Sequence, residues 1–254
     1  MDLSVLNHLH LVACGHGTRD PRGQSALAAL VEEIERHAGV PVHGCSVDVQ
    51  EPEVGEVVAG LSPEASGVIV PLLLSTGFHT RVDLKRAAHR FPAAGHGEPE
   101  HEVLGADPLG PSVRLARLQA RRLREAGWEP GEEHVVMGVA GSSVLSGRSD
   151  AETQRDYLSQ VLEVPVSLGY GASAQPEIGE AVAAARAEGA RRVAISSYLL
   201  APGTFYDRLL EAGADRVSPP LLVEDDAEGT GVVADLAVSR AAECAHRFLE
   251  GTQR

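Results

Sequence analysis

The sequence predicts an α/β protein of two similar halves, each a parallel sheet wrapped by helices. Short apolar runs alternate with stretches of helical periodicity along its 254 residues, as in parallel strands joined by crossover helices. The length suits two domains of roughly 125 residues each. Short motifs of the first half also recur in the same order in the second. We therefore expect two such halves facing each other across a cleft, which is a usual place for a ligand.

The first half shows a regular order of strands and helices. We expect strands over residues 9–14, 40–47 and 68–74, and helices over 26–34, from 51, over 80–90 and over 112–126. The segment 68–74 is apolar throughout, which is typical of a strand buried on both faces. The arginines of segment 112–126 predict a helix whose charged residues form a solvated face.

The second half restarts at Val135 and repeats this order. A shift of 124 residues places Leu11-Val12, Gly17-Thr18 and Pro52-Glu53 on Val135-Val136, Gly141-Ser142 and Pro176-Glu177, and a shift of 126 places Leu73-Leu74 and Gly77 on Leu199-Leu200 and Gly203. Counting the segment from Leu11 to Thr18 as one, three matches occur in order at almost one offset and indicate an internal duplication. We expect domains at 1–127 and 128–254, divided within the polar stretch that begins at Gly127.

Composition excludes several classes of protein. The net charge of −14 repels phosphate backbones, so no nucleic-acid partner is expected. The longest apolar run is far shorter than the roughly 20 residues that span a bilayer, and the amino terminus lacks the pattern of a secretion signal. Three cysteines without metal-type spacing argue against a disulfide framework. These features predict a soluble cytoplasmic protein without a membrane partner.

Polar side chains follow each predicted strand of the first half. His16 follows the first strand within Gly15-His16-Gly17, Asp48 follows the second strand, and His79 follows the third. Ligands in parallel sheets bind beyond the carboxyl ends of the strands. Two imidazoles and a carboxylate suit a divalent transition ion and leave positions open for exchange. The sequence predicts His16, Asp48 and His79 as catalytic residues, with His16 and His79 as metal ligands.

The second half serves as an internal comparison. Ala140, Ala172 and Phe205 stand at the positions that correspond to His16, Asp48 and His79. A merely structural role would be kept in both copies of the repeat. The loss of the polar set in a half that repeats the fold supports a functional site in the first half.

The segments around these residues resemble the class II tetrapyrrole chelatases, the sirohydrochlorin ferrochelatases and cobaltochelatases. The resemblance is carried by 11–19, 47–53 and 71–83, most specifically by the Gly-His-Gly turn and the Leu-Leu-x-x-Gly-x-His segment, and it extends over the whole chain. It implies that the two histidines bind the metal and assist its insertion. Many members have Glu where this chain has Asp48, which leaves direct ligation of the metal by Asp48 open.

The chemistry of metal insertion agrees with this residue set. Insertion of Fe²⁺ or Co²⁺ into a free-base tetrapyrrole releases two protons, and histidine, with an ordinary pKa near ~6.5, can ligate when neutral and accept a proton when free. The metal is then a substrate, and the absence of GxGxxG and GxxxxGK spacing predicts no organic cofactor. We expect Arg19, Thr80 and Arg81 to contact carboxylates of the tetrapyrrole. We also expect the protein to be a monomer with two pseudo-symmetric halves.

Other interpretations stay open at this point. The same histidines would serve a non-catalytic carrier of metal or tetrapyrrole. Gly15-His16-Gly17-Thr18 also partly resembles the turn of histidine phosphatases, although Gly15 stands where that chemistry needs an arginine. Asp48 alone is consistent with an Asx-type turn before Pro52. The choice between iron and cobalt is not determined by the ligand types.

Overall fold

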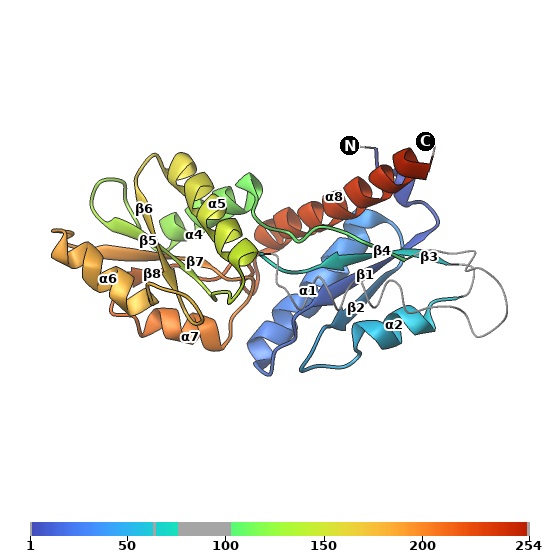
Figure 1. Cartoon of the computed structure of the whole chain (residues 1–254), viewed down its shortest axis with the longest axis horizontal. Coiled ribbons are helices and arrows are strands. Elements are labelled where there is room, and N and C mark those ends of the chain that lie inside the picture. Colours follow the sequence, from blue (N-terminus) through green and yellow to red (C-terminus); the bar gives the residue numbers. More distant parts are fainter. Residues whose placement is uncertain (1, 63–64, 76–102, 253–254) are drawn as a thin grey trace.

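Two four-stranded parallel sheets form the frame of the molecule (Figure 1). The computed structural model describes residues 2–62, 65–75 and 103–252. The first sheet has the order β2-β1-β3-β4 and the second the order β6-β5-β7-β8. The strands are β1 Leu9–Gly15, β2 Val42–Ser46, β3 Ser66–Pro71, β4 Val103–Gly105, β5 His134–Val139, β6 Val166–Tyr170, β7 Val193–Tyr198 and β8 Arg216–Val217. The predicted α/β class with two parallel sheets is confirmed.

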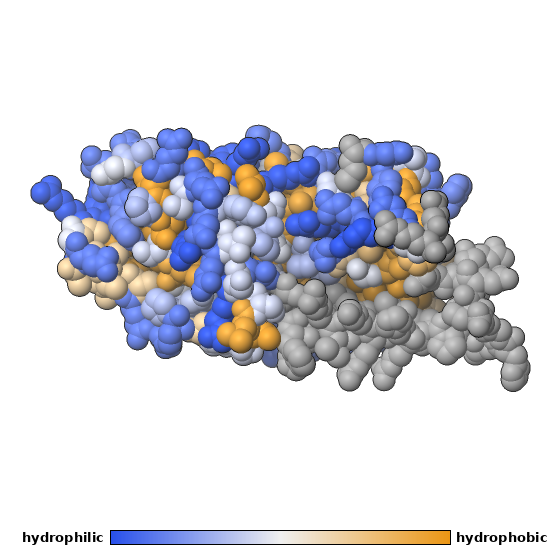
Figure 2. Space-filling view, turned by 45° about the horizontal axis from the view of Figure 1, so that its top comes forward, coloured by the Kyte–Doolittle hydropathy of each residue, from blue (hydrophilic) through white to orange (hydrophobic). Residues whose placement is uncertain are grey.

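Helices cover both sheets. A short 3₁₀ helix, η1 (Ser4–Leu6), precedes β1, and the helices are α1 Pro21–Ala38, α2 Val54–Gly60, α4 Val113–Glu125, α5 Leu145–Leu162, α6 Ile178–Ala187, α7 Thr204–Leu210 and α8 Ala227–Thr252. The helix expected over 80–90 lies outside the described residues. No helix among the residues described is both long and apolar enough to cross a bilayer. The face in Figure 2 carries hydrophilic side chains with apolar ones interspersed.

Local sequence explains where the elements begin and end. Helix α1 starts at Pro21, which suits a first helical position, after Asp20 accepts a hydrogen bond from the Arg22 N–H at 2.9 Å. It ends at Gly39, whose left-handed backbone favours glycine. The central strand β1 is buried from Leu11 to Gly15 because helices pack on both faces of its sheet.

The turns that follow β2 and β6 are alike in detail. The loops after β2 and β6 both close by a hydrogen bond onto the carbonyl oxygen of a proline, Ser46 N to Pro52 O at 3.1 Å and Tyr170 N to Pro176 O at 3.0 Å. Each proline follows a cis peptide bond and precedes a helix with a capping box. Equivalent sequence motifs therefore build equivalent turns in the two halves.

The two halves exchange one helix each. Helix α4, which ends the first half in sequence, packs on α5 and β7, whereas α8, which ends the second half, packs on α1 and β3 (Figure 1). A buried amide network holds α4 in place: the Gln154 side chain donates to Gln119 Oε1 at 2.8 Å, and Gln119 donates to Ser196 Oγ at 3.2 Å. Each sheet is thus covered partly by a helix from the other half. The predicted domain boundary at residue 127 remains a prediction.

The prediction of a solvated arginine face on α4 is wrong for Arg122. Its side chain is only 2% exposed, and it donates to Leu221 O at 2.7 Å and forms ion pairs with Glu125 and Asp226. The reason is the helix exchange, because α4 lies between α5 and α8 rather than at the outer edge of the first sheet.

Candidate functional site

A cleft of about 670 Å³ lies between the two halves, where the carboxyl ends of the central strands of both sheets meet. Segments that follow β1, β3, β5 and β7 line it, mainly residues 16–19, 72–75, 139–142 and 198–206. This is the place at which ligands bind in parallel α/β sheets. Its volume is within the range of ligand-binding pockets.

His16 lies on the first-half wall of this cleft. Its side chain is exposed and lines the cleft in the turn that leaves β1. The turn is tied to the loop after β2 because Val47 N donates to Gly15 O at 2.9 Å and Asp48 N donates to His16 O at 3.2 Å. The structure therefore brings the predicted residues His16 and Asp48 onto neighbouring loops.

Gly17 makes this close approach feasible. Its φ of +99° is unfavourable for other residues, and a Cβ at this position would overlap the carbonyl oxygen of Asp48. Gly141 repeats the arrangement in the second half, with a φ of +106° and the carbonyl oxygen of Ala172 in the same place. The alignment of Asp48 with Ala172 therefore holds in the backbone as well as in the sequence.

The Asp48 carboxylate makes a bond within its own loop. Asp48 is exposed, and its Oδ1 accepts a hydrogen bond from the Val49 N–H at 2.7 Å. Val49, not Asp48, is among the residues that line the cleft. This local bond is consistent with the turn-forming role considered for Asp48, and it leaves the second carboxylate oxygen for other partners.

The remaining predicted site residues are placed unequally. Arg19 is exposed and lines the cleft two residues after Gly17. His79, Thr80 and Arg81 lie outside the described residues, although the preceding segment 72–75 lines the cleft. No group of three or more histidine, cysteine or acidic side chains in the described part of the chain is arranged to hold a metal ion.

The second-half wall contributes residues that sequence reasoning did not identify as functional. The hydroxyl of the buried Tyr198 donates to Leu74 O at 2.9 Å. This bond joins the carboxyl end of β7 to the segment that follows β3, within the lining of the cleft. Burial raises the pKa of Tyr198, so this hydroxyl keeps its proton and remains a donor. Burial also raises the pKa of Tyr206, another tyrosine of the cleft lining. Nothing in the sequence around Tyr198 predicts its hydrogen bond to Leu74.

The two halves also touch beside the cleft. Gly23 of α1 approaches the backbone of Pro202 so closely that a Cβ would be about 2.7 Å from the Pro202 oxygen. The Arg22 guanidinium lies 3.2 Å from the Asp207 carboxylate on α7. Both partners of this pair are about half exposed, so it adds little stability but marks where the halves meet.

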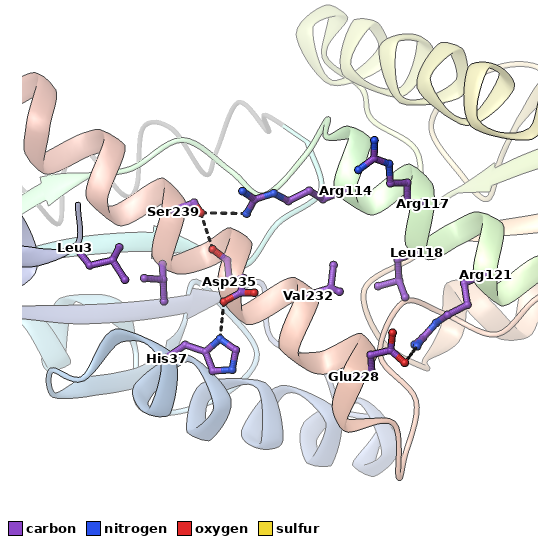
Figure 3. A pocket seen from close by; sticks show the side chains of 11 residues that line it. Leu3, His37, Arg114, Arg117, Leu118, Arg121, Glu228, Val232, Asp235 and Ser239 are labelled. Carbon is purple, nitrogen blue, oxygen red and sulfur yellow. Dashed lines mark hydrogen bonds and ion pairs between the residues drawn. The ribbon is translucent and has the colours of Figure 1, made fainter. Parts of the chain in front are cut away.

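A second hollow of about 520 Å³ lies among α1, α4 and α8 (Figure 3). Its charged residues are largely occupied with one another: His37 contacts Asp235 at 2.6 Å, and Arg121 contacts Glu228 at 2.9 Å. It lies among helices rather than at the ends of strands. The cleft that contains His16 is therefore the better candidate for a catalytic site.

Comparisons with known proteins agree on one family. The family model described as CbiX matches residues 10–126 and 134–222. A sirohydrochlorin ferrochelatase of Priestia megaterium is 26% identical over 206 residues, which cover 77% of this chain and 74% of that protein. A sirohydrochlorin cobaltochelatase of the same organism is 23% identical over 204 residues, which cover 78% of this chain and 66% of that protein.

Solved structures agree in fold. SirB from Bacillus subtilis with Fe³⁺ superposes with a TM-score of 0.74 at 21% identity, covering 95% of this chain and 97% of that one. The structure of CbiX, described as the terminal enzyme for biosynthesis of siroheme in denitrifying bacteria, gives a TM-score of 0.59 at 16% identity, covering 91% and 98%. Both likenesses extend over nearly the entire length of the chains compared.

Proposed function

The chain belongs to the CbiX family, and on that premise we propose that it is a sirohydrochlorin chelatase, which inserts a divalent metal ion into sirohydrochlorin and releases two protons. The observation that carries this conclusion is the match of the family model to both halves, together with a histidine at the wall of the cleft between them. A carrier would need the same ligands but would form no product. The partial resemblance to histidine phosphatases has no support from the relatives.

We propose Fe²⁺ as the metal, with Co²⁺ as the competing substrate. The support is a ferrochelatase relative at 26% identity and a cobaltochelatase relative at 23%. Open sites of imidazole and carboxylate accept either ion, and availability then decides. The metal is a substrate here: it enters from solution and leaves within the macrocycle.

The residues of the first-half wall have separate roles in this proposal. His16 holds the incoming ion together with His79. Asp48, on the loop bonded to the His16 turn, holds the hydrated ion or accepts a proton from the macrocycle. A neutral imidazole that has given up the metal accepts the other proton. Arg19, Thr80 and Arg81 bind carboxylates of the tetrapyrrole.

We further propose that the chain acts as a cytoplasmic monomer. One chain already supplies both walls of the cleft, and its three cysteines are free and buried, as expected in a reducing compartment. Size-exclusion chromatography with light scattering would contradict the monomer if the mass were twice 26.7 kDa.

An anaerobic absorbance assay tests the activity. Sirohydrochlorin is mixed with the protein and Fe²⁺ or, separately, Co²⁺, and the spectrum of the metallated product is followed against a protein-free control. We expect turnover with many product molecules per protein. Binding of metal or sirohydrochlorin without product above the protein-free control would indicate a carrier, and hydrolysis of a generic phosphate ester would favour the phosphatase alternative.

Metal binding by His16 is tested separately. His16→Ala is expected to lower the affinity for Co²⁺ by about 10-fold or more, measured by equilibrium dialysis. His8→Ala is the matched control, because His8 is exposed just before the other end of the same strand. Equal Co²⁺ affinity in wild type and His16→Ala would overturn the role given to His16.

A further inference from the structure

We propose that Phe205 and Arg208 on α7 form a platform for the tetrapyrrole, with the phenyl ring against the macrocycle and the guanidinium bound to a peripheral carboxylate. This inference rests on the proposed function, and it assigns the substrate-holding surface to the second half. The first-half residues proposed above bind the metal or carboxylates of the substrate, and none of them is assigned to the apolar face of the macrocycle.

Phe205 is an aromatic side chain exposed inside the cleft. It is 38% exposed and lines the cleft at the first turn of α7. The chain has only four phenylalanines and four tyrosines, and Tyr170 and Tyr198 of the cleft lining are themselves buried. An aromatic ring left partly in water within a concave site is apolar surface that a flat, conjugated ligand can cover.

Arg208 packs against the Phe205 ring. The guanidinium carbon lies 5.4 Å from the centroid of the Phe205 ring, within cation–π distance. One nitrogen of Arg208 donates to Gly171 O at 2.9 Å, which anchors the side chain. Gly171 also approaches the ring, since a Cβ there would lie 3.1 Å from Phe205 Cδ1. The ring is therefore held before any ligand arrives.

The pair matches the two chemical parts of the proposed substrate. The macrocycle is flat and apolar, whereas its carboxylates lie at the periphery. Arg208 is exposed and is not itself part of the cleft lining, but its guanidinium lies against the ring of Phe205, which is. Nitrogens not engaged by Gly171 provide donors of the kind that binds carboxylates well. A chain with a net charge of −14 needs such local cations to bind a polycarboxylate.

Phe205 and His16 line the same cleft from the two halves. Phe205 occupies the position that corresponds to His79 in the repeat, and Ala140 occupies that of His16. Both line the cleft. The second half thus offers an apolar surface where the first half offers metal ligands, and the ion would reach the macrocycle from the first-half side.

Binding of metal-free sirohydrochlorin to metal-free protein tests the platform, measured by absorbance titration. Phe205→Ala is expected to raise the Kd about 2- to 10-fold, the range given by an aromatic stacking contact, and Phe205→Trp is expected to restore it. Arg208→Gln is expected to weaken binding most at low ionic strength, which reduces the salt dependence of the Kd. Affinity for Co²⁺ stays at the wild-type value in these variants.

Leu210→Ala is the matched control. Leu210 lies on the same helix and is 52% exposed, but it does not line the cleft. Wild-type Kd in Phe205→Ala, or an equal loss in Leu210→Ala, would overturn the platform while leaving the chelatase activity intact. A wild type that binds sirohydrochlorin but forms no metallated product would instead overturn the proposed function. Absence of binding by the wild type would overturn both.

Discussion

The backbone N–H of Asp48 donates to His16 O. One oxygen of the Asp48 carboxylate accepts from the Val49 N–H, and the other remains for another partner. If it helps hold the ion or takes a pyrrole proton, Asp48→Asn should lower the rate most when metal is limiting. Activity should fall in acid as histidines become protonated, and added metal should restore it, because the ion competes with protons for the same lone pair.

The measurement is the initial rate between about pH 5.5 and 8.5 at limiting and at high Fe²⁺. We expect the recovery by metal to be weaker in Asp48→Asn than in wild type, and Asp48→Glu to behave like wild type. A flat profile that is the same in Asp48→Asn would contradict the role of Asp48.

Asp226 supports a different, structural prediction. Burial alone would raise its pKa, but hydrogen bonds from the Gly229 N–H and the Arg122 guanidinium hold the pKa below its ordinary 3.8. A lowered folded pKa gives stability that is present above the unfolded pKa and is lost as pH falls through the folded pKa. Asp226→Asn should therefore lower the free energy of unfolding near pH 7, by about 2–4 kcal/mol, because the buried Arg122 loses a partner.

Urea unfolding of wild type and Asp226→Asn from pH 7 down to about pH 3 provides the measurement. The difference in the free energy of unfolding between wild type and Asp226→Asn should become smaller below about pH 4. A difference that stays constant across this range would show that the charge of Asp226 is not what stabilises the folded chain.

The residues of the site were predictable to different degrees. His16 was found because it follows a clear strand and sits between two glycines, and because the second copy of the repeat lacks it. Tyr198 and Phe205 carry no such signal: one is identified by a bond to a backbone oxygen 124 positions away, the other by exposure inside a cleft that exists only after folding.

At the scale of elements, the two turns at Gly17 and Gly141 form a natural pair. Gly17→Ala and Gly141→Ala should each lower the free energy of unfolding by about 2–4 kcal/mol, because each combines an unfavourable φ with overlap of a carbonyl oxygen. Only Gly17→Ala should also weaken Co²⁺ binding, since only its turn carries a histidine.

Gly39→Ala separates the two causes. Gly39 also has a positive φ, of +66°, but open space surrounds the place of a Cβ. Gly39→Ala should therefore lower the free energy of unfolding by only about 1 kcal/mol. Urea midpoints give the stabilities, and equal losses in Gly39→Ala and Gly17→Ala would contradict the importance of the carbonyl contact.

Strands and helices of the described chain were largely predictable because their periodicities are local. Helix α4 illustrates the limit. Its bounds, Val113–Glu125, agree with the predicted 112–126, but its surroundings depend on which sheet it covers. Arg122 is buried because α4 packs on the sheet of the other half. The spacing of arginines in the sequence does not predict that packing.

The whole molecule depends on the exchange of α4 and α8. Fragments 1–127 and 128–254 should each fail to unfold cooperatively when produced alone, because each lacks the helix that covers part of its sheet. When the two fragments are co-expressed, they should form a stable 1:1 complex. Calorimetry and light scattering give the result, and a cooperative transition in either isolated fragment would contradict it.

The exchanged helices also bear on the history of the chain. The second half, which has no histidine at position 140 and no acid at position 172, would be dispensable if the first half folded without it. Here the second half holds α4 and supplies α8 to the first half, so its deletion would expose the sheet of the half that is proposed to hold the metal. Selection can therefore retain the second half for its packing alone, and a position that has no metal to hold, such as Phe205, is open to another use, here the proposed aromatic platform.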